Sequence, residues 1–326
     1  MLSLRTVIAR SAAELDTIAP LWNELLRHQE HTIFQRFSWN RLAAEMFCDR
    51  MTPHVVCLES DSGAAIIPAV IAHSTGHVQF LGEALFDYRD VLHAGDGAIL
   101  RLAWQRLGEC ARPLRVVSLH ESAAKHRWTG LPLVPFARAP QVERSAIDEE
   151  AFRLAHSRLG RQMRRLQRRG VALRRFTGAN SDVLRRLYDC KRMDFAADTA
   201  NLFVDRRRCE FMVAAAALEH TRCDIFTLED ADARLIAGLV TFRDRDVRRF
   251  YTIYFHPAWA RYSPGVALLY EVTAQSLGQG LSCDYLTGEY PYKLRLANSS
   301  RLLYKVELSA PQMAGIAGAA MDSSAA

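Results

Sequence analysis

The sequence has no apolar run long enough to cross a bilayer. Its longest one, residues 64–72, is about half a membrane span and contains Pro68. The amino-terminal residues carry no apolar run of signal-peptide length. The seven cysteines are scattered, odd in number and without a C-x-x-C pair, which is typical of reduced and mostly buried thiols. Together these absences predict a cytoplasmic protein without a transmembrane segment.

Several signatures of catalysis and metal binding are also missing. The sequence has no G-x-S-x-G and no P-loop, so neither a serine hydrolase nor a P-loop NTPase is expected. It has no zinc-finger spacing and no RRM aromatic signature. His28 and His31 form an H-x-x-H pair without a third ligand in register, so no metal site is expected.

The composition is that of a globular protein with room for two domains. The chain has 326 residues, of which 49% are hydrophobic and 24% charged. Hydrophobic periodicity predicts an α+β chain of helices, an antiparallel meander, and then a helix and further strands. Expected helices include 11–28, 38–49, 148–169 and 180–197, and one expected strand is 64–73. Residues 137–147 predict a connector between domains at 1–145 and 148–308, and the Ala/Gly/Ser-rich tail 309–326 predicts disorder.

The net charge of +6, from 42 basic and 36 acidic residues, is unevenly distributed. Residues 153–192 contain thirteen Lys or Arg and two Asp. Such a segment favours an anionic partner: cofactor phosphates, a nucleotide-linked substrate, anionic lipid or nucleic acid. The alternative is a helix whose arginines are simply solvated.

The most informative stretch runs from Leu235 to Lys293. Two predicted strands, 235–242 and 247–255, precede Ser263-Pro264-Gly265, which predicts a helix start with the serine hydroxyl as cap. The helix is expected to end at Gly278 or Gly280. A strand that leads into a helix with free amino-terminal amides predicts an anion site suited to a phosphate.

Residues 257–293 resemble the C-terminal half of the BioF-like, CelD-like branch of GNAT acyltransferases, which are relatives of the FemAB aminoacyltransferases. The motifs that carry the resemblance are a tyrosine-rich strand, a Tyr-Ser-Pro-Gly turn, an Asp-Tyr strand end and a Gly-Glu-x-x-Tyr-Lys run, here at 251–254, 262–265, 284–285 and 288–293. The likeness extends upstream to Phe34-Gln35 with Ser38-Trp39, to Asp87-Tyr88 with Asp90, and to the arginine-rich helix 161–170.

The resemblance implies two tandem GNAT-like domains, each a mixed, mainly antiparallel sheet flanked by helices. The first would be degenerate, and the second would hold the acyl-donor site. The implied reaction transfers an acyl group from acyl-CoA (acetyl-CoA) to an amine of a sugar, amino acid or cell-envelope polysaccharide precursor, without a metal. Two alternatives are a FemAB-like transferase that uses aminoacyl-tRNA, and a non-catalytic accessory protein of envelope polysaccharide biosynthesis. No nucleic-acid partner is expected except tRNA under the first alternative.

The resemblance also suggests where the donor binds. The superfamily's phosphate loop reads Gln/Arg-x-x-Gly-x-Gly/Ala, and the aligned run here is 262–267. Gly265 and Ala267 match, whereas Tyr262 replaces the usual Gln or Arg and Pro264 contributes no N–H. The expected cofactor-binding residues are Arg261, Ser263, Gly265, Val266 and Ala267. The alternative is a plain helix cap.

For the acceptor's proton, the candidate catalytic residues are Asp284, Glu289 and Tyr254. A carboxylate among tyrosines could take a proton from an amine, although Asp284 could equally hold its loop through backbone N–H bonds. The expected substrate-binding residues are Asp87, Tyr88, Asp90, Tyr251, Tyr285, Tyr292 and Lys293. For the Asp87–Asp90 segment the alternative is an Asx-type turn, and for Lys293 it is a surface ion pair.

Overall fold

The computed structural model describes residues 4–95, 97–120, 131–178 and 180–318. The chain is α+β and divides into two compact units, one of Met1–Ala137 with Leu302–Ala326 and one of Arg138–Arg301. Each unit has its own hydrophobic core, so each is described by itself.

The first unit contains a four-stranded antiparallel sheet in the order β1-β3-β4-β7. A second run of strands has the order β15-β8-β6-β5-β2, in which β6 and β8 are parallel. The strands are β1 (Arg5–Ala9), β2 (Met51–Pro53), β3 (Val55–Ser60), β4 (Gly63–Ile67), β5 (Ala69–Ala72), β6 (Val78–Phe80), β7 (Leu92–Gly95), β8 (Leu114–Leu119) and β15 (Ser299–Leu308).

The helices of the first unit are α1 (Ala12–Asp16), α2 (Ala19–His28), α3 (Phe37–Met46), α4 (Gly97–Gly108) and α12 (Ala310–Gly318), with 3₁₀ turns η1 (Ile33–Gln35) and η2 (Glu83–Leu85). Helix α4 packs against β3 and β4 and against α12. Trp104, Leu107 and Met313 are buried in this core. The close approach of α12 requires Gly108, because a Cβ there would lie 2.6 Å from the Met313 carbonyl oxygen.

The second unit is built on the strand order β10-β11-β12-β13-β14-β9. All neighbours are antiparallel except β13 and β14, which are parallel. The strands are β9 (Val134–Val142), β10 (Ala172–Thr177), β11 (Arg222–Glu229), β12 (Leu235–Asp244), β13 (Val247–Phe255) and β14 (Ser282–Asp284). The apolar residues of β11 and β12 are buried on both faces, which explains why their sequences read as continuous apolar runs.

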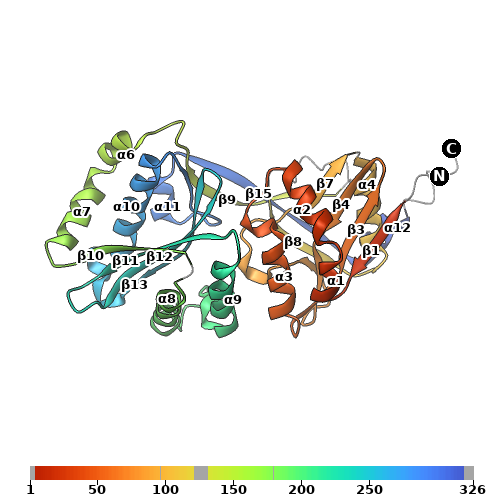
Figure 1. Cartoon of the computed structure of the whole chain (residues 1–326), viewed down its shortest axis with the longest axis horizontal. Coiled ribbons are helices and arrows are strands. Elements are labelled where there is room, and N and C mark those ends of the chain that lie inside the picture. Colours follow the sequence, from red (N-terminus) through yellow and green to blue (C-terminus); the bar gives the residue numbers. More distant parts are fainter. Residues whose placement is uncertain (1–3, 96, 121–130, 179, 319–326) are drawn as a thin grey trace. The chain divides into compact units, whose positions relative to one another are not determined.

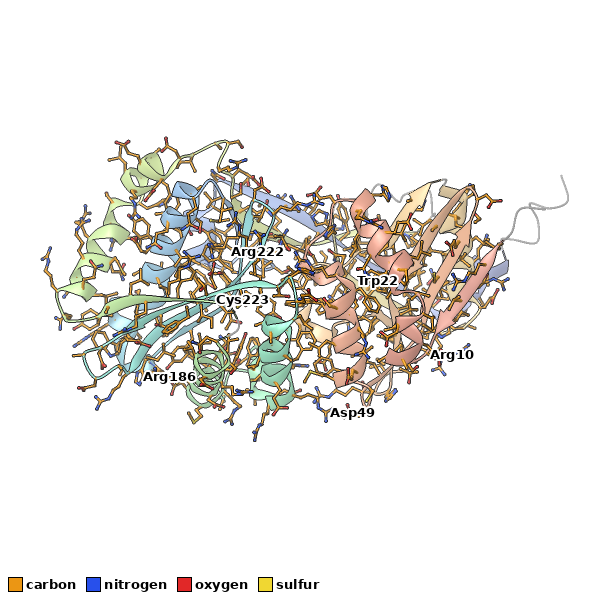
Figure 2. The ribbon with its side chains drawn as sticks, viewed as in Figure 1. Arg10, Trp22, Asp49, Arg186, Arg222 and Cys223 are labelled. Carbon is orange, nitrogen blue, oxygen red and sulfur yellow. The ribbon has the colours of Figure 1, made fainter. Side chains whose placement is uncertain are left out.

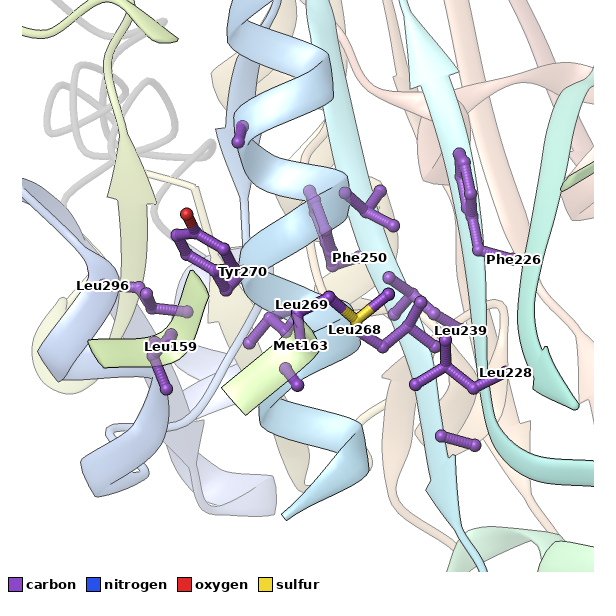
Figure 3. Packing of buried hydrophobic residues seen from close by; sticks show 14 of the residues in the cluster. Leu159, Met163, Phe226, Leu228, Leu239, Phe250, Leu268, Leu269, Tyr270 and Leu296 are labelled. Carbon is purple, nitrogen blue, oxygen red and sulfur yellow. The ribbon is translucent and has the colours of Figure 1, made fainter. Parts of the chain in front are cut away.

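Helices cover both faces of this sheet (Figure 1). Helices α6 (Glu149–Ala155), α7 (Ser157–Gln167) and α10 (Pro264–Gly278) share one core with strand residues such as Phe226 and Phe250 (Figure 3). Helices α8 (Ser181–Asp194) and α9 (Arg206–Ala217) pack on the opposite face, where Tyr188 bonds to Thr252 of β13. Shorter elements are η4 (Leu202–Val204), η5 (Pro257–Tyr262) and α11 (Pro291–Leu296).

The structure corrects several predicted elements. The helix predicted at 11–28 is two helices, because Pro20 begins a new one in the first turn of α2. The helix predicted at 148–169 is also two, α6 and α7, with a break at His156. The strand predicted at 64–73 is interrupted at Pro68, which cannot donate to a ladder. The predicted connector 137–147 overlaps the second half of β9, whose Ala139 and Val142 are buried.

The prediction of a disordered tail was wrong for residues 310–318, which form α12. Their small residues allow close packing on α4, Met313 is fully buried, and the Ser309 N–H donates to the Gln312 side chain at 2.8 Å. Residues 319–326 lie outside the described part of the chain. The unit boundaries also differ from the predicted domains, because Leu302–Leu308 belong with the first unit. None of the described helices is both long and apolar enough to span a bilayer.

Candidate functional site

Strands β13 and β14 form a fork in the sheet of the second unit. Their parallel pairing covers only Val247–Arg249 against Ser282–Asp284, so the last paired residues are Arg249 and Asp284. Immediately beyond, the register of β13 against β12 shifts by one residue, which leaves Tyr251 as the extra residue of a β-bulge. A bulge bends a strand and increases its twist, and bulges are common next to active sites. The second half of β13 thus has one edge that β14 does not cover.

The alternation of hydrogen bonds along β13 shows which of its peptide groups lie on that edge. The His256 N–H donates to the Ile236 carbonyl at 2.8 Å, and peptide groups along an antiparallel strand alternate between its two edges. The peptides of Thr252 and Tyr254 therefore face β12, whereas those of Ile253 and Phe255 face the fork. Their N–H groups and the Phe255 carbonyl are available to an extended ligand in the way a further strand would use them, whereas the Ile253 carbonyl accepts a hydrogen bond from the Lys191 ammonium.

Helix α10 begins beside the same edge. A Cβ added to Gly265 would lie 3.4 Å from Ile253 Cδ1 and 3.6 Å from Phe255 Cβ, so the first turn of the helix lies against β13. Pro264 occupies the first turn, as predicted. The predicted serine cap was wrong: Ser263 adopts a left-handed conformation (φ 43°) and its side chain makes no capping hydrogen bond. Within the described chain, the Gly265 and Val266 N–H groups have no acceptor, whereas Ala267 N–H bonds to the Ser263 carbonyl.

Three arginine side chains surround the ring of Tyr262, two residues before the start of this helix. The guanidinium carbons of Arg169 and Arg261 each lie 4.7 Å from the centre of its ring, and that of Arg165 lies 5.5 Å away. The Gln162 side chain donates to the Tyr262 carbonyl. The three arginines form no ion pair with any described carboxylate. Two free amides at a helix start and an unpaired arginine cluster together favour an anion there.

Asp284 is buried at the base of the fork. One of its carboxylate oxygens is ion-paired with Arg249, and the other accepts the Leu286 N–H at 2.8 Å. Arg249 also pairs with Asp244 at 2.8 Å, and the Asp244, Arg249 and Asp284 side chains are all at most 6% exposed. These contacts connect β13 to β14 at the point where the two strands diverge. They match the alternative in which Asp284 holds its own loop through a backbone N–H bond. Asp284 is therefore better explained as a positioning residue than as a base.

The loop after β14 holds the other predicted residues of the Gly-Glu-x-x-Tyr-Lys run. The Lys293 ammonium donates to the Thr287 carbonyl at 2.9 Å and lies 5.3 Å from the centre of the Tyr290 ring. Gly288 adopts φ 111°, and a Cβ there would lie 2.8 Å from that ring. Lys293 thus stabilises the conformation of this loop by donating to one of the loop's own backbone carbonyls. Glu289 is exposed at the loop's surface.

The four tyrosines predicted as catalytic or substrate-binding residues have different surroundings. Tyr285 is fully buried, and its hydroxyl lies 2.9 Å from Thr273 Oγ1, as expected of a core residue. Tyr292 stacks on Tyr290, and burial raises its pKa to about 12. Tyr251 is half-buried at the bulge. Tyr254 faces α8.

The Tyr254 hydroxyl donates to Asp194 Oδ2 at 2.6 Å. Burial, and then this hydrogen bond, raise the pKa of Tyr254, so its hydroxyl is protonated at neutral pH. Asp194 itself is exposed at the end of α8. A proton that reaches the Tyr254 oxygen therefore has a short route to a solvated carboxylate. Neither Asp194 nor Lys191, one helical turn earlier, was predicted as a site residue, because nothing local in the α8 sequence marks its last turn.

In the first unit, the structure brings together the two upstream motifs. The Gln35 side chain donates to the Tyr88 carbonyl at 2.8 Å, and the Phe34 ring packs edge-on against Tyr88 with centroids 6.0 Å apart. Tyr88 is fully buried, whereas Asp87 is half-buried. Asp90 is 6% exposed and accepts the N–H of the next residue, Val91, at 2.8 Å, which is one residue short of an Asx turn. The cavity lined by Gln35, Tyr88 and Asp90, among others, has a volume of about 10 Å³, which is room for one water molecule.

The described residues include no group of His, Cys, Asp and Glu that could hold a metal. All seven cysteines are free thiols. Burial raises the pKa of Cys223 (Figure 2) and of Cys283 to about 12, so these two are protonated and unreactive at neutral pH.

Comparisons with known proteins agree with this architecture. Residues 153–294 match the family model described as an acetyltransferase (GNAT) domain. No curated protein sequence matches the chain significantly. Among solved structures, the C-terminal domain of a putative lysylphosphatidylglycerol synthetase from Agrobacterium fabrum is similar, with a TM-score of 0.60 at 14% identity, over 94% of this chain and 95% of that one.

Two further structures have the same fold. A tandem GNAT protein of the clavulanic acid biosynthesis pathway has a TM-score of 0.55 at 10% identity, over 94% of this chain and 98% of that one. FemX has a TM-score of 0.56 at 9% identity, with the same coverage. The predicted α+β fold of two tandem GNAT-like domains is therefore confirmed, and residues 153–294 are similar to a GNAT acetyltransferase domain. The assignment to the BioF-like, CelD-like branch stays a prediction.

Proposed function

We propose that the second unit transfers an acyl group from acyl-CoA to an amine of a sugar, amino acid or cell-envelope polysaccharide precursor. The observation that supports this most is the free first turn of α10, with the arginines around Tyr262, next to the uncovered edge of β13. The pyrophosphate of the donor suits the Gly265 and Val266 amides, and Arg165, Arg169 and Arg261 suit its remaining phosphate charge.

The rest of the donor would follow the strand edge. Its amide-containing arm can pair with the Phe255 peptide, which directs the thioester toward Ile253 and the bulge at Tyr251. The acceptor's amine, once deprotonated, attacks the thioester carbonyl carbon and expels the thiolate. Tyr254 and Asp194 offer a route for the amine's proton, with Glu289 as the other candidate acceptor.

Ser263→Asp should weaken acetyl-CoA binding by about tenfold or more, because a carboxylate at the helix start opposes the phosphate charge. The substitution should not unfold the protein, since Asp tolerates the left-handed conformation that Ser263 adopts. Ser263→Asn is the matched neutral control and should bind like wild type. Titration calorimetry with acetyl-CoA measures all three proteins. Equal affinities for the Asp and Asn variants would show that the donor does not bind at the start of this helix.

A second candidate, transfer from aminoacyl-tRNA, is favoured by the exposed arginines of α7 and its end. These residues form no ion pair with any described carboxylate: Arg158, Arg161, Arg164, Arg165, Arg168 and Arg169. If they bind RNA, the affinity for tRNA should fall by roughly one power of salt concentration per phosphate contacted. A filter-binding series from low to physiological salt tests this. Absence of a complex at low salt would discard the tRNA-dependent reaction and leave acyl-CoA as donor.

A further inference from the structure

Lys191 reaches the uncovered edge of β13 from the last turn of α8. Its ammonium donates to the Ile253 carbonyl at 2.8 Å and lies 5.8 Å from the centre of the Phe195 ring. Helix α8 can approach the sheet closely because Gly238 of β12 leaves room for Leu187, which would lie 2.4 Å from a Cβ there. Since the Ile253 peptide faces the fork, the Lys191 charge lies at the fork as well.

No carboxylate among the described residues pairs with this poorly solvated cation. The one hydrogen-bond acceptor of Lys191 among the described residues is the neutral Ile253 carbonyl. Burial lowers the pKa of Lys191, and the charge of Asp198 opposes that effect only in part. An ammonium held in this way attracts negative charge, and an anion that forms beside it is stabilised more strongly than it would be in water.

The neighbouring groups indicate where such an anion would lie. The Ile253 and Phe255 N–H groups are on the same edge as the carbonyl that Lys191 holds. An oxygen bound to the Ile253 N–H, beside the carbonyl of the same residue, would lie close to the remaining protons of the ammonium. Two kinds of donor then converge on one oxygen, an arrangement that stabilises a developing oxyanion.

We propose that Lys191 is a catalytic residue that stabilises the negative charge on the acyl carbonyl oxygen of the donor. This inference rests on the proposed acyl transfer. The amine nitrogen bonds to the carbonyl carbon, and the π electrons of the C=O bond move to the oxygen, beside Lys191. When the C=O bond reforms, the carbon–sulfur bond breaks and the thiolate leaves with the electron pair. The amine's proton is accepted by a group other than Lys191, and the Lys191 ammonium stays protonated throughout.

The test measures release of free CoA from acetyl-CoA with hydroxylamine as the acceptor. Hydroxylamine is mostly unprotonated near neutral pH, so it needs no general base, and its reaction isolates stabilisation of the oxyanion. Lys191→Met should lower kcat by about 100-fold, the scale of one oxyanion-hole donor. Its acetyl-CoA affinity by calorimetry and its thermal midpoint should change little. Lys191→Arg keeps the charge and should retain part of the rate.

Lys305→Met is the matched control, because Lys305 is in the first unit and pairs with Glu307 at 2.8 Å. It should react like wild type. If wild type binds acetyl-CoA and Lys191→Met reacts at the wild-type rate, Lys191 does not stabilise the oxyanion. The proposed donor site is not contradicted by that result. A parallel loss of rate, affinity and thermal midpoint would make Lys191 a structural residue and also overturn the inference. If wild type does not bind acetyl-CoA, the proposed reaction itself fails.

Discussion

Asp284→Asn should destabilise the second unit by about 3 kcal/mol, the lower end of the cost of removing one partner from a buried ion pair. Arg249 would keep Asp244 as its counter-charge but lose the Asp284 carboxylate at the point where β13 and β14 separate. Chemical denaturation followed by circular dichroism measures this loss as a lower midpoint with an unchanged slope. Glu289→Gln, in an exposed position of the following loop, is the control and should lie within about 0.5 kcal/mol of wild type.

The same variant decides between the two roles considered for Asp284. A positioning residue loses stability and donor affinity together, because the fork loosens. A general base instead loses about 100-fold or more in rate while stability and donor binding stay normal. The second pattern would restore Asp284 as the base and contradict its role in positioning the two strands.

Tyr254→Phe should lower the rate of acyl transfer to an amine by about 100-fold without weakening acetyl-CoA binding. The variant removes the hydroxyl that connects β13 to the Asp194 carboxylate and leaves the ring against Phe195. Proton transfer by a positioned group contributes about 100-fold or more to a rate. The rate is measured as CoA release with a panel of amine acceptors, at several pH values.

Two further variants make this result specific. Asp194→Asn should show a similar loss if the carboxylate receives the proton. Tyr304→Phe, in the first unit, removes a hydroxyl elsewhere and should leave the rate unchanged. A normal rate and pH profile in both Tyr254→Phe and Asp194→Asn would exclude this proton route, and Glu289 would become the candidate to test.

The sequence predicted the parts of the site that depend on local signals. Pro264 and Gly265 mark a helix start because proline fits the first turn, and the alternating residues of β13 mark a strand. The role of Ser263 was not predictable in the same way. Its left-handed conformation follows from the preceding 3₁₀ turn, which already uses the Ser263 N–H, bonded to the Ala260 carbonyl at 2.9 Å.

The fork depends on contacts between residues far apart in the chain, which no local pattern records. Arg249 and Asp284 meet across 35 positions, and Tyr254 and Asp194 across 60. Lys191 looks like one of many basic residues in a charged segment until α8 is placed against β13. In the same way, Gln35 and Tyr88 are separate motifs in the sequence and a single buried cluster in the fold.

Amide hydrogen exchange at the start of α10 tests the central claim most directly. The Gly265 and Val266 N–H groups have no acceptor in the described chain, so they should exchange rapidly in the free protein. Acetyl-CoA should protect a peptide covering residues 262–268, and the Ser263→Asp variant should show no such protection. If acetyl-CoA binds, as judged by calorimetry, and exchange in this peptide does not change, the donor binds elsewhere and the proposed site is wrong.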